Sequence, residues 1–171
     1  MANTYQLISS NTLSSTAASV TFSSIPATYT DLVLRCSIRT DAAAIDDYLL
    51  ITANGSATQY SSTNMRGNGT TVTSIRATND SYIRYPDVNG NSATSNTFSN
   101  TELYWPNYAG SANKVVSSFS VAETNGTAVN MDVVAGLIRN TSAITEIVID
   151  QPSGANFVSG SSFFLYGIKN S

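Results

Sequence analysis

The side chains that most often carry catalysis are nearly missing from this 171-residue chain. It has no histidine and a single cysteine, Cys36. Triads built on serine or cysteine use a histidine base, and zinc and most transition-metal sites draw on histidine and cysteine ligands, so these sites are excluded. The glycine-rich patterns of nucleotide-binding loops are absent as well. Cys36 lies in phase with Leu34 and Ile38, which predicts a small buried hydrophobe rather than a nucleophile.

Carboxylates are the remaining groups for acid–base chemistry. Asp46 and Asp47 are neighbours, so on a strand they point to opposite faces, and the other acids are scattered. A glycosidase needs two carboxyls about 5 to 9 Å apart, and no spacing here indicates such a pair. The segment Asp87–Asn91 partly matches a calcium loop, but glycine stands fourth instead of sixth and Phe98 replaces the bidentate glutamate. We therefore expect an Asn/Gly turn there, and no enzyme, cofactor or metal.

Aromatic side chains are better candidates for recognition. The only tryptophan, Trp105, lies between Tyr104 and Tyr108, and a similar group spans Tyr82–Tyr85. Exposed aromatics can stack on sugar rings or anchor a protein interface. The alternative is that Tyr104 and Trp105 complete the core of a strand that ends at the following proline. The candidate interface or glycan-binding residues are Tyr82, Arg84, Tyr85, Tyr104, Trp105, Tyr108, Phe164 and Tyr166.

Four Ile-Arg pairs recur, at residues 38–39, 75–76, 83–84 and 138–139. An inward isoleucine followed by an outward arginine suits the end of a half-buried strand, and the charge discourages edge-to-edge aggregation. The alternative is that these arginines pair with carboxylates of a neighbouring subunit.

The elements that must position these residues are β-strands, because apolar and polar residues alternate with a period of two along most of the chain. Asn125-Gly126 suits a type I′ turn, so Val115–Thr124 and Val129–Arg139 should pair as a hairpin. Val129, Met131, Val133, Ala135 and Leu137 share one face of the second of these strands.

Other turn signals predict further connections. Asn54-Gly55 should join Tyr48–Ala53 to Ala57–Tyr60, and the Gly/Asn/Ser-rich stretches Ser61–Val72 and Tyr85–Asn96 are expected to be surface loops. Long connections of this kind favour Greek-key crossings over a simple meander. We therefore predict one domain, residues 1–171, with an all-β fold: an antiparallel β-sandwich, jelly-roll-like, of about ten strands.

The segment Gly160–Ile168 is predicted to be a packed strand on which the fold closes. Phe163 and Leu165 occupy one face, and Phe164, Tyr166 and Ile168 the other, so both faces are apolar. Either the strand is buried on both sides, or one side lies against a neighbouring subunit.

Charge and hydropathy limit the partners. The net charge is −3 and charged residues make up 11% of the chain, with only two lysines, so the clustered cations that nucleic acid binding needs are missing. No run approaches 18 apolar residues, so we expect no membrane span. The N-terminus has neither the basic nor the apolar region of a secretion signal, so we expect synthesis in a host cytoplasm without export by a recognisable signal.

Several segments, taken in order, resemble small virion structural proteins of tailed bacteriophages, especially those of marine and cyanobacterial phages. They are Thr4–Ile8, Ala18–Pro26, Tyr29–Leu34, Arg66–Gly69 and Gly160–Ile168. The resemblance covers both ends of the chain and part of the middle.

This resemblance implies a jelly-roll-like sandwich assembled on the virion, often as a homotrimer. It implies a capsid decoration (cement) protein that stabilises the particle and contacts itself and the major capsid protein. The alternative is a tail-fibre or receptor-binding module that contacts tail components and recognises host surface glycan. No catalytic residues are carried over.

Overall fold

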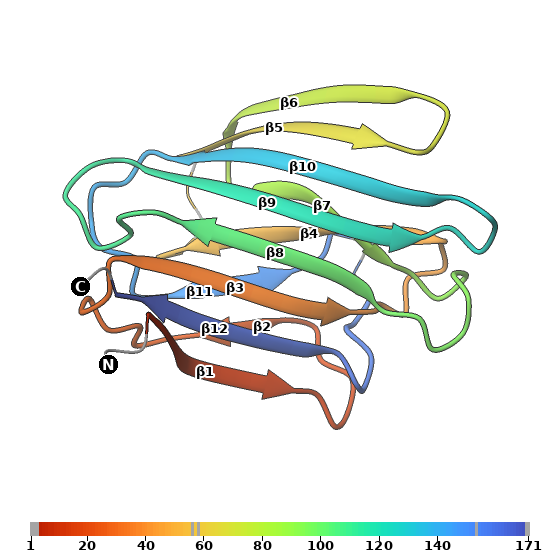
Figure 1. Ribbon diagram of the computed structural model, residues 1–171, viewed down its shortest axis with the longest axis horizontal. Helices are drawn as coiled ribbons and strands as arrows, with labels where there is room; N and C mark the ends of the chain where they lie inside the picture. The colour runs from red at the N-terminus through yellow and green to blue at the C-terminus, as the bar shows by residue number, and fades with distance from the viewer. Residues whose placement is uncertain (1–3, 56, 58, 153, 170–171) are drawn as a thin grey trace.

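The protein is an all-β sandwich of two antiparallel sheets (Figure 1). A computed structural model describes residues 4–55, 57, 59–152 and 154–169, without the side chain of Tyr85. The described residues form twelve strands, so the predicted jelly-roll-like sandwich is confirmed with two strands more than expected. No helix of the described part has the length and apolarity to cross a membrane.

The large sheet has eight strands and the small sheet four. In spatial order the large sheet contains β1 (Tyr5–Thr12), β12 (Ser162–Ile168), β3 (Asp31–Ile38), β8 (Ser99–Trp105), β9 (Lys114–Glu123), β10 (Val129–Ile138), β5 (Tyr60–Gly67) and β6 (Val72–Asp80). The small sheet contains β2 (Val20–Phe22), β11 (Ile147–Asp150), β4 (Asp46–Ala53) and β7 (Ile83–Asn89). The β5–β6 end of the large sheet extends beyond the small one in Figure 1.

The apolar core lies between the two sheets. Alternate residues of β3, among them Leu34 and Cys36, are buried in it together with Leu49 and Ile51 of β4. Cys36 is therefore the small core residue that its phase predicted, and burial raises the pKa of its thiol, which keeps it protonated and unreactive.

The closing strand β12 lies between β1 and β3, so strands from the two ends of the chain are neighbours. Phe163 and Leu165 are fully buried, whereas Phe164 and Tyr166 are half-buried on the outer face of the sheet. The backbone of Gly167 lies against a ring: a Cβ atom there would stand 2.3 Å from Cγ of Tyr29. The predicted packed strand is confirmed, with one face in the core and the other partly open.

Several predicted connections are wrong. Residues 61–72, expected as a loop, contain most of β5, and residues 85–96 contain most of β7. Asp87 and Asn89 thus belong to a buried strand rather than to a turn. Asn54-Gly55 does not make a hairpin, because β4 and β5 belong to different sheets. Instead, Oδ1 of Asn54 accepts hydrogen bonds from the backbone N–H groups of Thr145 and Glu146 and fixes the approach to β11.

The β9–β10 hairpin is confirmed, with a continuous register from Glu123 opposite Val129 to Lys114 opposite Ile138.

The arginine of the first Ile-Arg pair was predicted to lie in solvent, and this prediction is wrong. Arg39 is buried, and its guanidinium donates hydrogen bonds to the backbone carbonyls of residues 91, 93, 94 and 97. It therefore holds the connection between β7 and β8 from inside.

Candidate functional site

The outer face of the large sheet carries a concentration of exposed apolar side chains over β9, β10, β5 and β6. We call this set the outer apolar face: Met65, Val72, Val115, Phe119, Val129, Met131 and Val133. Their exposed fractions run from 44% for Phe119 to 71% for Val72. Seven of the eleven large hydrophobic residues that are exposed in the described part of the chain therefore gather on one side of the molecule.

Strand register makes this face continuous. Val133 of β10 is paired with Phe119 of β9 on one side and with Met65 of β5 on the other. Cβ atoms of directly paired residues lie about 5 Å apart, so these three side chains form one row. The outward positions between 115 and 121, 131 and 137, and 61 and 67 hold no charged residue. Contiguous apolar patches of this kind mark interaction sites on soluble proteins.

The inward side of the same strands is partly polar. It places Val116, Val134 and Ile138 in the core, but it also buries polar residues where the usual pattern would have apolar ones. Buried polar residues include Ser62 and Asn64 on β5, Ser118 and Ser120 on β9, and Asn130 and Asp132 on β10. Among the described residues, no hydrogen-bond partner is found for the three serine hydroxyls. The sequence placed Val129, Met131 and Val133 on one face of β10; in the structure that face points outward.

Two carboxyls meet inside this polar region and form what we call the carboxyl pair. Asp132 of β10 accepts a 2.8 Å hydrogen bond from Nδ2 of Asn64, and its charge acts on Asp87 of β7 across the gap between the sheets. Arg66 Nη2 lies 2.8 Å from Oδ2 of Asp87 and also pairs with Asp46. Burial is the main reason that the pKa of Asp87 is raised to about 8, and the negative charge of Asp132 raises it further. Burial also raises the pKa of Asp132.

The carboxyl pair is structural rather than catalytic. Asp87 is 4% exposed and Asp132 is 1% exposed, so a substrate cannot reach either. Because the pKa of Asp87 is raised to about 8, its carboxyl keeps its proton at neutral pH. No group of three or more metal-binding side chains among the described residues is arranged to hold an ion. The sequence did not reveal this pair, because its members lie 45 residues apart on strands of different sheets.

The predicted aromatic platform at residues 104–108 is wrong. Trp105 and Tyr108 are fully buried in the core, and the Tyr108 hydroxyl donates to the backbone carbonyl of Pro26. The alternative that the sequence left open, a strand whose last residues complete the core, is the one observed. Tyr104 alone of the three reaches the outer face, where its hydroxyl donates a 2.8 Å hydrogen bond to Oδ2 of Asp31.

The other predicted residues fall in two places. Tyr82 and Arg84 lie near β7, where the guanidinium stacks 4.8 Å from the ring centroid and pairs with Asp80 at 2.7 Å. The side chain of Tyr85 is outside the described residues. Phe164 and Tyr166 lie on the outer face of β12, and Tyr166 and Tyr104 both pair with Val33, one on each side of β3. The structure thus brings Tyr104 close to Tyr166 but not to Tyr82 or Arg84.

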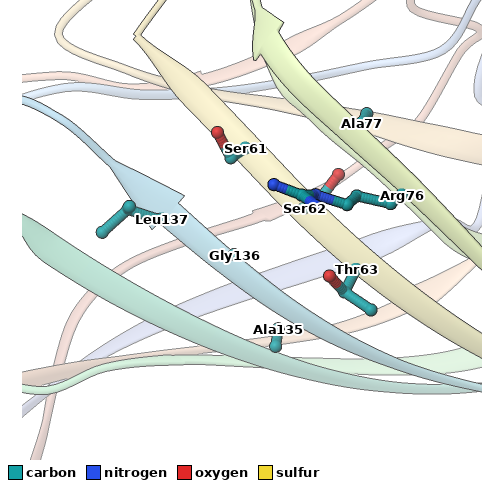
Figure 2. A pocket seen from close by; sticks show the side chains of 8 residues that line it. All are labelled: Ser61, Ser62, Thr63, Arg76, Ala77, Ala135, Gly136 and Leu137. Carbon is teal, nitrogen blue, oxygen red and sulfur yellow. The ribbon is translucent and has the colours of Figure 1, made fainter.

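A hollow of about 330 Å³ lies next to the outer apolar face, between β10, β5 and β6. Figure 2 shows Arg76 of β6 extending over β5 above this hollow. The other lining residues are small or hydroxylated, apart from one leucine: Ser61, Ser62, Thr63, Ala77, Ala135, Gly136 and Leu137 (Figure 2). Arg76 is the only charged side chain among these lining residues, so they provide no acid–base pair.

No family model and no curated protein matches this chain. Among solved structures, the galectin LEC-6 of Caenorhabditis elegans is similar at 10% identity and a TM-score of 0.33, with 98% of this chain and 96% of the galectin covered. The S-type phycobiliprotein lyase CPES of Guillardia theta is similar at 12% identity and a TM-score of 0.21, with 68% and 90% covered. Likenesses at these TM-scores carry no argument about function.

Proposed function

We propose that this chain is a bacteriophage virion structural protein that decorates the capsid and stabilises it by binding copies of itself and the major capsid protein. The virion location is supported by the resemblance of several sequence segments to phage virion proteins. The observation that carries the assembly role is the outer apolar face, which needs a partner in water. At about 25 cal/mol per Å² of apolar surface, its burial would contribute to holding an assembly together.

The architecture is consistent with a role that requires no chemistry at the surface. The carboxyl pair is sealed inside, and the sheets form a single sandwich that could serve as a rigid block between neighbours. A protein that binds only the assembled capsid stabilises that state by mass action. The tail-fibre alternative receives less support, since the tryptophan and one tyrosine of its glycan platform lie in the core.

Immunogold labelling and cryo-electron microscopy of purified particles test this proposal. We expect label on the head in regular positions, and a capsid that disassembles at a higher temperature with the protein bound than without it. Label confined to the tail would contradict decoration in favour of the fibre alternative. Particles that carry no label at all would contradict both virion roles.

A further inference from the structure

The outer apolar face carries a charge pattern that matches itself. Arg76 lies on β6, at one edge of the face, and has no ion pair among the described residues. Glu102 lies on β8, at the opposite edge, and is paired with Arg35 at 2.7 Å, with 45% of its side chain exposed. Between these two edges, the outward positions of β10 and β5, and those of β9 from 115 to 121, hold no charged residue, and Glu123 stands outward at the end of β9.

We propose that the outer apolar face binds the same face of a second copy of this chain about a two-fold axis that runs along β10. The strands β9 and β5 are the first neighbours of β10, and β8 and β6 are the second neighbours. The two-fold rotation therefore lays β9 of one copy over β5 of the other, and β8 over β6. A self-complementary contact of this kind closes after two copies.

This arrangement places opposite charges together twice. Successive strand pairings place Glu102 and Ser74 of β6 at the same level of the sheet. The row between them consists of Phe119, Val133 and Met65. Arg76 follows two residues later, a displacement of about 7 Å along the strand, which long side chains can span. Each Arg76 thus reaches Glu102 of the second copy, and the hollow beside it receives side chains from the facing strands.

The area is sufficient for a stable pair. The five strands from β8 to β6, spaced about 4.8 Å apart and about eight residues long, cover roughly 500 to 650 Å² on each copy, so the pair buries about 1,000 to 1,300 Å² in total. That is the lower end of stable protein interfaces. The pairing deepens the proposed assembly role, but it rests on the surface itself and can be tested without a virion. It differs from the homotrimer that the phage resemblance implies.

Sedimentation equilibrium of the full chain tests the pairing. We expect twice the mass of one chain, with a dissociation constant that rises roughly tenfold or more in Phe119→Thr and in Val133→Thr. Leu7→Thr is the matched control, because Leu7 is 49% exposed on β1 at the far edge of the same sheet, and it should stay within about twofold of wild type. Circular dichroism melting verifies that each variant is folded.

A charge exchange tests the geometry. Arg76→Glu and Glu102→Lys should each weaken the pair, and the double variant should restore most of the loss, because the two charges meet across the interface. The pairing would be overturned by a monomer at all concentrations, by a mass of three copies, or by a dimer that the face variants do not weaken. It would also be overturned if the losses of affinity in the two charge variants simply added in the double variant. A solution monomer that still labels capsids overturns the pairing alone, whereas a dimer absent from particles overturns only the virion role.

Discussion

The carboxyl pair predicts a dependence of stability on pH that is opposite to the common one. An aspartate in an unfolded chain loses its proton near pH 4, whereas native Asp87 keeps its proton up to about pH 8. Between these values the native state binds one more proton than the unfolded state. The free energy of unfolding must then fall as the pH rises, by about 1.4 kcal/mol per pH unit for one proton.

The perturbation that isolates this effect is Asp87→Asn. An amide has nearly the shape of the protonated carboxyl, but it does not ionise. Between pH 5.5 and 7.5, wild type should lose about 2.7 kcal/mol of unfolding free energy, and the variant should lose less than about 1 kcal/mol. Desolvation raises the pKa of Glu123, but hydrogen bonds from Thr94, Asn125 and Gly126 lower it by more. Glu123 is therefore ionised in both the native and the unfolded state between pH 5.5 and 7.5, and it does not change the slope in this window.

Urea denaturation followed by circular dichroism at pH 5.5, 6.5 and 7.5 measures these free energies. The control is Asp150→Asn, which changes an exposed aspartate on β11 and should keep the wild-type slope. A wild-type stability that is flat or rises across the window would refute the reasoning, as would an Asp87→Asn variant with an unchanged slope.

Three further substitutions test the packing. In Gly136→Ala the new Cβ would lie 2.5 Å from Cγ1 of Val116 and 2.8 Å from Cδ1 of Ile83, so thermal melting should show a loss of about 1 to 3 kcal/mol. Trp105→Ala empties a fully buried site and should cost about 3 to 5 kcal/mol in chemical denaturation; a neutral effect would contradict its core position. Arg39→Met leaves four carbonyls without their donor and should speed proteolytic cleavage between β7 and β8, whereas unchanged cleavage would show that the loop holds itself.

Alternation in the sequence was enough to predict the sandwich, the β9–β10 hairpin and the burial of Cys36, because each depends on local periodicity or turn chemistry. The strand β5 was missed because its Ser, Thr and Asn residues are also those of loops, and pairing with β10 and β6 overrides that composition. Trp105 was offered as a surface platform because a short aromatic run has no direction until its strand is placed in a sheet.

The orientation of β9 and β10 could not be predicted from local pattern. On β10 the set Val129, Met131 and Val133 is the more apolar, and by pattern alone it would point inward. The opposite face is the buried one: it places Val134 and Ile138 in the core, and its Asp132 is hydrogen-bonded to Asn64 of another strand. The only available signal was an aspartate and an asparagine opposite a run of uninterrupted hydrophobic residues.

The position of β12 has a consequence for the order in which the protein is made. Among the described residues, this strand is the last of the twelve in sequence order and the only one paired with β1. During synthesis, β1 must wait unpaired, and the edge of β3 stays open, until residues 162–168 have left the ribosome. At high concentration that open edge can accept β12 from a neighbouring nascent chain, so the closing step is where strand exchange between copies would begin.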